Sequence, residues 1–326
     1  MAGQRSQYPL EVMCRLLEVS RGGFYVWQKR RGKEPCARLK RRSELKQKIK
    51  AVHSQSRDTY GSPRVYQELK AQGEKVCENT VAKLMKEDGI RSVVRRRFRV
   101  KTTDSAHAHP IAPNTLDREF HADHPDTKWA ADITYIATGE GWLYLAAVID
   151  LCSRKIVGWA MAEHMKATLC IDALMMALKR RNPQAGLVHH SDRGVQYACE
   201  NYRDLLDREG ITCSMSGRGD CYDNAVMESF FKTLKVELVY QQNFATRAQA
   251  ISAVFEYVEA FYNRRRLHSS LDYTSPADFE AALDAKASTE KKTNARSAAD
   301  AAGKCAAPLR KTPHHKQVGA SVGEKK

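Results

Sequence analysis

The chain has 326 residues, of which 42% are hydrophobic and 28% charged, and its formal net charge is +16. This length predicts two or three domains, and the hydrophobic content excludes a wholly disordered chain. The longest apolar run, residues 142–149, is too short to span a bilayer, which needs about 18 residues or more. Residues 1–10 contain no apolar signal-peptide core, so we expect neither an integral membrane protein nor a secreted one.

The charge is unevenly distributed along the chain. Residues 1–101 contain 26 Lys/Arg and 10 Asp/Glu, a net charge of +16, whereas residues 102–286 contain 19 and 25, a net charge of −6. Residues 287–326 contain 9 and 3, a net charge of +6. The basic first third predicts a nucleic-acid footprint, with a merely solubilising surface as the alternative. The acidic middle can act on a polyanion only through specific groups, and metal cations would help it to do so.

The cysteines indicate a reduced environment. The nine of them are an odd number and form no Cys-x-x-Cys pair. A disulfide framework and a zinc ribbon are therefore both poorly supported, and we expect a protein of the cytoplasm.

Helical patterns dominate the first third of the chain. They cover residues 9–19, 37–56, 65–72 and 81–87, and the last two are short helices separated by a Gly-containing turn. This arrangement predicts a helix-turn-helix, in which the second helix enters the major groove and the basic run 91–101 grips phosphates. A generic small helical bundle is the alternative.

From residue 128 onward the pattern changes to strands and helices. Strands are expected over residues 129–136, 142–149, 155–161, 186–190 and 211–214, and helices over residues 167–178, 197–209, 223–239 and 246–261. Three consecutive strands followed by alternating helix and strand predict an α/β fold, a mixed five-stranded sheet with one antiparallel portion.

Three acidic residues stand out by their local context. Asp132 is a lone charge in the middle of an otherwise buried strand, and Asp192 follows the end of the fourth strand. Glu228 lies on the helix after a Gly-rich loop, with 35 residues between it and Asp192. Spacing alone is poor support, because roughly four such pairs of acids should arise by chance.

Other acids compete for a catalytic role. Asp150 ends a strand before a turn, Asp223 is well placed as a helix cap, and Asp220 lies in the Gly-rich loop. We rank all three below Asp132, Asp192 and Glu228.

Several sequence motifs carry a family resemblance over about residues 8–280. They are Trp129-x-x-Asp132-Ile-Thr-Tyr135, His190-Ser-Asp192-Arg193-Gly-x-Gln-Tyr197, Asp223-Asn-Ala-x-x-Glu228-Ser-Phe-Phe-x-x-Leu-Lys235, Tyr262-Asn-x-x-Arg265-x-x-x-His268, Tyr60-Gly-x-x-Arg64 and Pro110-x-Ala-Pro-Asn114. Together they resemble the DDE transposase and retroviral-integrase superfamily, and most closely the OrfB-type insertion-sequence transposases of the IS-three group.

The resemblance implies a ribonuclease-H-like core and metal-dependent DNA strand transfer. Asp132, Asp192 and Glu228 would be both the catalytic residues and the metal ligands, with Asp132 bridging and the other two completing one metal each. Two Mg²⁺ ions, for which Mn²⁺ can substitute, suit this chemistry, because they serve both ends of an in-line phosphodiester exchange. Three convergent acids repel one another, and the metals relieve that repulsion.

Basic residues near these motifs are candidate DNA contacts. Lys232 and Lys235 share the face of Glu228 by helical spacing, although a solvated lysine is the alternative for Lys235. The further candidates are Arg193, Arg64, Arg95, Arg96, Arg97, Arg264 and Arg265.

The predicted organisation has six parts. They are a helical segment (1–35), a basic helix-turn-helix-like DNA-binding module (36–101), a linker (102–126), a ribonuclease-H-like integrase core (127–240), a C-terminal helical extension (241–285) and a disordered basic tail (286–326).

The expected partner is double-stranded DNA, as element terminal repeats and as target, bound by a homo-oligomer in the bacterial cytoplasm at the nucleoid. The chain has no four-heptad zipper, so an upstream-frame product is a further expected partner, either as a separate subunit or as a fusion. No membrane partner is expected. Two other readings stay open: a ribonuclease-H-like endonuclease without strand transfer, and a non-enzymatic DNA-binding regulator or inactive derivative.

Overall fold

The protein was analysed as a computed structural model that describes residues 2–31, 34, 36–93, 110–217 and 221–289. It divides into two compact units, each built from separate stretches of chain. Unit 1 comprises Met1–Asp104, Thr134–Tyr144 and Ala225–Tyr257, and unit 2 comprises Ser105–Ile133, Leu145–Asn224 and Val258–Lys326. Within the part of the chain that the structure describes, no helix combines the length and hydropathy needed to cross a bilayer.

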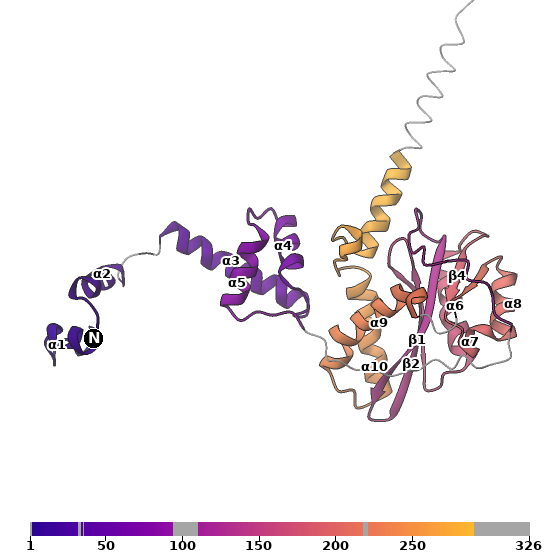
Figure 1. Ribbon diagram of the computed structural model, residues 1–326, viewed down its shortest axis with the longest axis horizontal. Coiled ribbons are helices and arrows are strands. Elements are labelled where there is room, and N and C mark those ends of the chain that lie inside the picture. The colour runs from indigo at the N-terminus through magenta and orange to yellow at the C-terminus, as the bar shows by residue number, and fades with distance from the viewer. Residues whose placement is uncertain (1, 32–33, 35, 94–109, 218–220, 290–326) are drawn as a thin grey trace, which may run out of the picture. The chain divides into compact units, whose positions relative to one another are not determined.

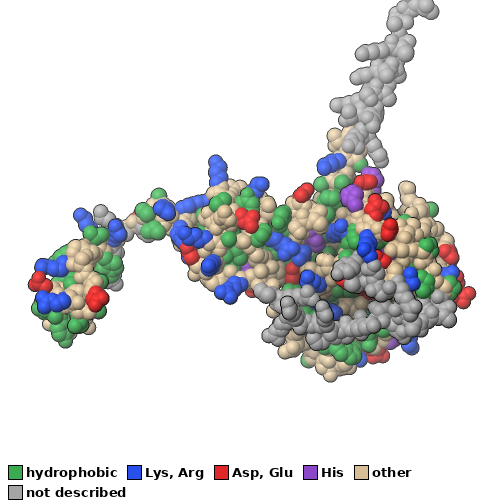
Figure 2. Space-filling model, in the orientation of Figure 1, with side chains coloured by type: hydrophobic (Ala, Val, Ile, Leu, Met, Phe, Trp, Pro, Cys, Tyr) green, Lys and Arg blue, Asp and Glu red, His purple; other side chains and the backbone are tan. Residues whose placement is uncertain are grey.

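The first part of unit 1 is helical, as the sequence predicts. Its elements are η1 (Ala2–Gln4), α1 (Leu10–Leu16), α2 (Arg21–Arg31), α3 (Ala37–Gln55), α4 (Ser62–Ala71) and α5 (Glu78–Glu87). The Ser20 hydroxyl caps α2 by accepting from the Gly23 backbone N–H at 3.0 Å. Helices α3, α4 and α5 pack together around Val65, Leu69 and Val81, all fully buried. Lys and Arg side chains cover much of this helical surface (Figure 2).

A five-stranded sheet runs in the order β3-β2-β1-β4-β5. The strands are β1 (Lys128–Thr138), β2 (Gly141–Asp150), β3 (Ile156–Ala162), β4 (Val188–Ser191) and β5 (Thr212–Met215). Pairing of β1 with β4 and of β4 with β5 is parallel. Only residues 139 and 140 separate β1 from β2, so that pair is antiparallel. The mixed sheet expected from the sequence is therefore confirmed.

Helices α6 (Ala167–Arg181), α7 (Val195–Ala198) and α8 (Glu200–Arg208) lie beside β4 in unit 2 (Figure 1). Helix α6 packs closely on β3 at Gly158, where an added Cβ would lie 2.2 Å from the Ala173 carbonyl oxygen. Only glycine permits this approach of helix to strand. The sequence predicts one helix over residues 197–209, but Cys199 has extended backbone angles (φ −67°, ψ 152°) and divides it into α7 and α8.

The chain continues with η2 (Cys221–Asn224), α9 (Ala225–Glu237), η3 (Val239–Gln241), α10 (Arg247–Phe255), the π-helix η4 (Glu256–Tyr262), η5 (Ser269–Leu271) and a helix over residues 276–289. A Thr246–Gln249 capping box starts α10. The single helix predicted over residues 246–261 is thus part α and part π. The last helix also extends four residues beyond residue 285, where the sequence predicts the tail to begin; residues 290–326 lie outside the described residues.

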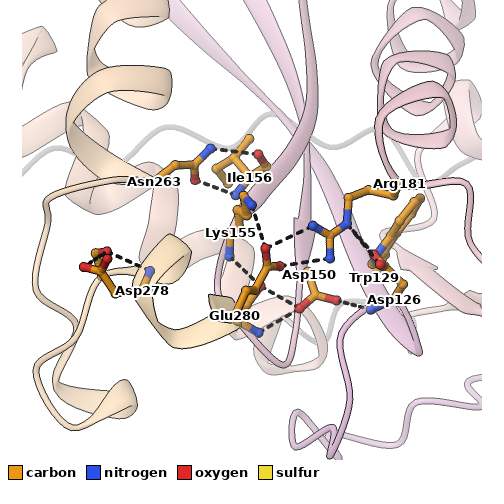
Figure 3. Close-up of polar contacts among 11 residues, drawn as sticks. Asp126, Trp129, Asp150, Lys155, Ile156, Arg181, Asn263, Asp278 and Glu280 are labelled. Carbon is orange, nitrogen blue, oxygen red and sulfur yellow. Dashed lines mark hydrogen bonds and ion pairs between the residues drawn. The ribbon is translucent and has the colours of Figure 1, made fainter. Parts of the chain in front are cut away.

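A group of part-buried ion pairs, the Glu280 cluster, joins four segments of unit 2, at residues 126, 155, 181 and 280 (Figure 3). The Arg181 guanidinium lies 2.8 Å from the Asp126 carboxylate and 2.9 Å from that of Glu280. Lys155 Nζ donates to Glu280 at 2.6 Å, and Asp150 accepts from the Asp126 backbone N–H at 2.8 Å. Burial would raise the pKa of Glu280, but Lys155 and Arg181 hold it below its usual value. The cluster attaches the last helix to the start of β1.

Candidate active site

The pairing of β1 with β4 brings two predicted catalytic acids together. The register pairs Trp129 with His189 and Ala130 with His190. The paired residues end at Ala130 and His190, two positions before each aspartate; Asp132 continues β1, whereas Asp192 directly follows the end of β4 at Ser191. The charges of both carboxylates contribute to the raised pKa values of Cys170 and Tyr197, so both aspartates lie near these two side chains. Both aspartates are half-buried. Carboxylate oxygens are the ligands that Mg²⁺ prefers, so the pair fits a divalent metal.

Backbone N–H groups orient both carboxylates. Asp132 Oδ1 accepts from the Ile133 N–H at 2.7 Å, and Asp192 Oδ1 accepts from the Gly194 N–H at 2.9 Å. An added Cβ at Gly194 would lie 2.9 Å from Asp192 Oδ1, so glycine leaves room for this carboxylate. Arg193 Nε donates to the Ser216 carbonyl, which connects the same turn to the end of β5.

The wall behind the two aspartates is apolar and neutral. Cys170 on α6 and Tyr197 on α7 are each 2% exposed. Burial, with smaller contributions from the charges of Asp192 and Asp132, raises the pKa of the Cys170 thiol to about 12. The same causes raise the pKa of Tyr197. Both groups therefore stay protonated, and the aspartates carry the negative charge of this region.

A second polar network joins Asp223 to Asn114 and Arg118, which belong to the segment predicted as a linker. The Asp223 carboxylate accepts from Arg118 Nε at 2.8 Å, Asn114 Nδ2 at 3.1 Å and the Gly217 backbone N–H at 2.7 Å. Burial would raise the pKa of Asp223, but these donors hold it below its ordinary value. Asp223 thus has a structural explanation.

The network also involves the segment predicted as a linker, residues 102–126, whose bounds stay a prediction. Residues 110–126 contain no helix or strand, but they belong to unit 2, and Leu116 is 2% exposed. The Ser214 hydroxyl accepts from the Thr115 and Leu116 backbone N–H groups, at 3.0 and 3.1 Å. This part of the segment is fixed to the core because its backbone hydrogen bonds and one apolar side chain are buried there.

The competing acids have other roles or lie outside the described residues. Asp150 is fully buried and accepts from the Ser153 N–H and hydroxyl, at 2.7 and 2.8 Å, which closes the turn after β2. Asp220 falls outside the described residues.

Glu228 lies on α9 and belongs to unit 1, whereas Asp132 and Asp192 belong to unit 2. Its side chain is exposed, and partial desolvation raises the pKa of its carboxyl. Across the described residues, no group of three or more His, Cys, Asp or Glu side chains is gathered as a metal site. Glu228 as the third ligand therefore stays a prediction.

The predicted DNA contacts have varied surroundings. Lys232 is exposed on α9, and Lys235 Nζ lies 4.6 Å from the centre of the Tyr135 ring. The Arg64 guanidinium lies 5.6 Å from the centre of the Tyr60 ring. Arg264 and Arg265 are exposed after η4, while Arg95, Arg96 and Arg97 lie outside the described residues.

Sequence reasoning missed the Arg118–Asp223 pair and the aromatic surroundings of Lys235. Arg118 and Asp223 are 105 positions apart, and nothing in either local pattern connects them. A signal did exist for Lys235, because Tyr135 belongs to the same motif as Asp132.

Comparisons with known proteins agree with this architecture. Residues 122–221 match the family model of an integrase core domain, residues 40–98 that of an HTH-like domain, and residues 228–282 a second integrase core model. The chain is 46% identical over 267 residues to the insertion element IS600 uncharacterized 31 kDa protein of Shigella sonnei, covering 82% of this chain and 97% of that protein. It is 42% identical over 280 residues to transposase InsF for insertion sequence IS3A of Escherichia coli strain K12, covering 85% and 95%.

A solved structure is also similar over much of the chain. It is the simian T-cell lymphotropic virus intasome in complex with PP2A regulatory subunit B56 gamma, which aligns at 13% identity with a TM-score of 0.42. The alignment covers 84% of this chain and 80% of that one.

Proposed function

The chain belongs to the family of IS3-type insertion-sequence transposases, within the DDE transposase and retroviral-integrase superfamily, and we propose that it cuts the ends of its DNA element and joins them to new DNA. The observation that supports this proposal is that Asp132 on β1 and Asp192, directly after the neighbouring parallel strand β4, both raise the pKa of the buried Cys170 and Tyr197 side chains.

The reaction needs no covalent enzyme intermediate. In the first step a water oxygen bonds to phosphorus at the element end, the bond from phosphorus to the 3′ oxygen breaks, and a 3′-OH is left. In the second step that 3′-OH oxygen bonds to a target phosphorus and displaces the target 3′ oxygen. One phosphodiester is exchanged for another, so the joining step needs no external energy source. The proton of each attacking hydroxyl passes to solvent.

The three acids are proposed as the metal ligands. Two bound Mg²⁺ ions, or Mn²⁺ in their place, would activate the attacking oxygen and stabilise the leaving one. Asp132 would help to hold both ions, and Asp192 and Glu228 would each help to hold one. The backbone N–H groups of Ile133 and Gly194 orient the two aspartates for this task. Neutral Cys170 and Tyr197 behind them keep that wall free of competing charge.

The helical module holds DNA in this proposal. Residues 1–101 have a net charge of +16, and the matched HTH-like domain lies within them. Arg64, Arg264 and Arg265 are assigned to phosphates, together with the two lysines of α9. The active form is a homo-oligomer on DNA at the bacterial nucleoid, alone or with an upstream-frame product as subunit or fusion.

The test supplies a pre-cut element end, taken from the inverted repeats that flank the gene, with target DNA and Mg²⁺. The wild-type protein should give joined product, and Asp132→Asn should bind the same DNA without joining it. Cleavage without joined product would favour an endonuclease, and DNA binding without metal-dependent nicking would favour a regulator.

A further inference from the structure

Exposed aromatic rings gather at the start of β2 in unit 1. Trp142 packs edge-to-face against Tyr135, with ring centres 4.9 Å apart, yet its side chain remains 49% exposed. Tyr240 is 40% exposed and near enough to Tyr135 to contribute to its raised pKa, after burial. Large aromatic surfaces left half in water are costly, which suggests that this one is covered by a ligand.

Two cations accompany these rings. Lys235 Nζ lies over the Tyr135 ring, and Arg247 Nε donates to the Trp142 carbonyl at 3.3 Å. Glu140 accepts from the Arg247 backbone N–H at 2.8 Å, so its carboxylate lies at the start of α10. We call Tyr135, Trp142, Lys235, Tyr240 and Arg247 the Trp142 patch.

The turn beside the patch is held rigidly. Gly139 donates its backbone N–H to the Phe244 carbonyl at 2.9 Å. An added Cβ at Gly139 would lie 2.5 Å from the Ala245 carbonyl oxygen, so only glycine fits. The hairpin is thus fixed to the segment that starts α10, and Trp142 is presented on an ordered support. A preorganised ring loses little entropy when it binds.

We propose that the Trp142 patch binds an unpaired DNA base, which stacks on Trp142 while Lys235 and Arg247 face the adjoining phosphates. Aromatic rings beside cations are how proteins hold single-stranded DNA, because every base has a stackable face and every linkage is anionic. A protein partner would meet the same apolar area, but the two flanking cations favour a polyanion.

The inference rests on the proposed function, because a protein that processes DNA ends meets terminal bases that unpair at low cost. Holding one such base would keep the end of the strand from re-pairing during the reaction.

Tryptophan fluorescence offers a direct test with a 15-nucleotide oligo(dT) strand in EDTA. Trp129 and Trp159 are buried, whereas Trp27 is 47% exposed and so is a matched control for Trp142. Oligo(dT) should quench the wild-type protein and Trp27→Phe, and the quenching should be largely lost in Trp142→Phe. Equal quenching of both variants would overturn the proposal.

Binding to a duplex with a three-nucleotide overhang, compared with the blunt duplex, gives the second readout. The wild-type protein should prefer the overhang, Trp142→Ala should weaken overhang binding about tenfold with blunt binding unchanged, and Trp142→Phe should restore most of the preference. Equal losses on both duplexes would contradict a stacking site. Self-association that depends on Trp142, with the overhang preference intact in Trp142→Ala, would instead identify a protein interface and also overturn it.

These readouts separate the two proposals, because none of them needs metal. A Trp142-dependent overhang preference in a protein that never joins DNA would leave this site standing and remove the proposed function. If the protein joins DNA but shows no such overhang preference, the proposed function stands and the Trp142 site is removed.

Discussion

Unit 2 contains two groups of acids, and the two groups differ in the donors that contact their carboxylates. In the Glu280 cluster, Asp126 and Glu280 lie within 3.0 Å of Arg181, so the charge balance is internal. At the candidate active site, Asp132 on β1 and Asp192, directly after the neighbouring strand β4, accept from backbone N–H groups. The first arrangement joins segments of the fold, while the second is the proposed site for divalent cations.

The largest expected effect is on strand joining, and it distinguishes the acids of the candidate active site from those of the Glu280 cluster. Asp132→Asn should reduce strand joining by about a thousandfold or more, because metal stabilisation of the transition state is worth several kcal/mol. Its thermal unfolding midpoint should stay the same or rise, since one of two neighbouring like charges is removed. Gel assays of joined product measure strand joining, and calorimetry measures the unfolding midpoint. A large fall in the midpoint would mean that Asp132 is structural.

Arg181→Met is expected to lower the stability of the fold, in contrast to Asp132→Asn. Removing this guanidinium takes the ion pair from the part-buried Asp126 and leaves the buried Glu280 with Lys155 alone, so the free energy of unfolding should fall by about 1.5–3 kcal/mol. Arg180→Met is the matched control: its ion pair with Glu259 is 40% exposed on the arginine side and should contribute at most about 1 kcal/mol. Denaturant melts compare the variants, and equal losses would contradict a special role for the cluster.

As the pH falls, the contribution of the sheet to stability should be lost at a higher pH than the contribution of the Glu280 cluster. His189 is buried on β4 beside the Tyr202 hydroxyl, and burial lowers its pKa from 6.5 to about 4. The unfolded chain takes up this proton first, so stability is complete above pH 6.5 and falls as the pH drops toward 4, by up to about 1.4 kcal/mol per pH unit.

The carboxyl of Glu280 has the lowered pKa of an ion-paired acid, so its contribution is lost only as the pH falls below about 4.5. Unfolding midpoints measured at intervals of half a pH unit resolve the two windows. Burial also lowers the pKa of His190 to about 4, so His189→Phe should roughly halve the slope of the upper window, and His121→Asn, a change at an exposed histidine, should leave that slope unchanged. A wild-type profile that is flat between pH 6.5 and 4.5 would show that His189 is not held neutral.

The smallest effect is expected at Lys232. If this exposed lysine on α9 meets a phosphate, Lys232→Ala should reduce the slope of log affinity against log salt by about 0.9 and weaken binding a few-fold. Fluorescence anisotropy over a salt series measures the slope. An unchanged slope would assign Lys232 to solvent.

Local patterns predicted most of the fold. Alternation predicted β1 and β2, and the family motifs selected Asp132 on β1 and Asp192 directly after the neighbouring strand β4, whose catalytic role stays a prediction. Two details of the helices were not predicted. The break at Cys199 and the π-helical turn of η4 are small backbone changes that hydrophobic periodicity does not register.

The Glu280 cluster could not have been predicted either. It joins residues 126, 181 and 280, and no local pattern marks any of them as a partner of the others. The docking of residues 114–118 on Ser214 and Asp223 was hidden for the same reason, since their polar composition reads as a linker.

Iron-directed cleavage tests the central claim most directly. Fe²⁺ is bound in place of Mg²⁺ in the DNA complex, and peroxide with ascorbate then cuts the backbone beside each metal. The account predicts cuts near Asp132, Asp192 and Glu228, suppressed by excess Mg²⁺ and absent in Asp132→Asn. Cuts centred on Asp126, Asp150 and Glu280 instead, or no localised cuts at all, would contradict it.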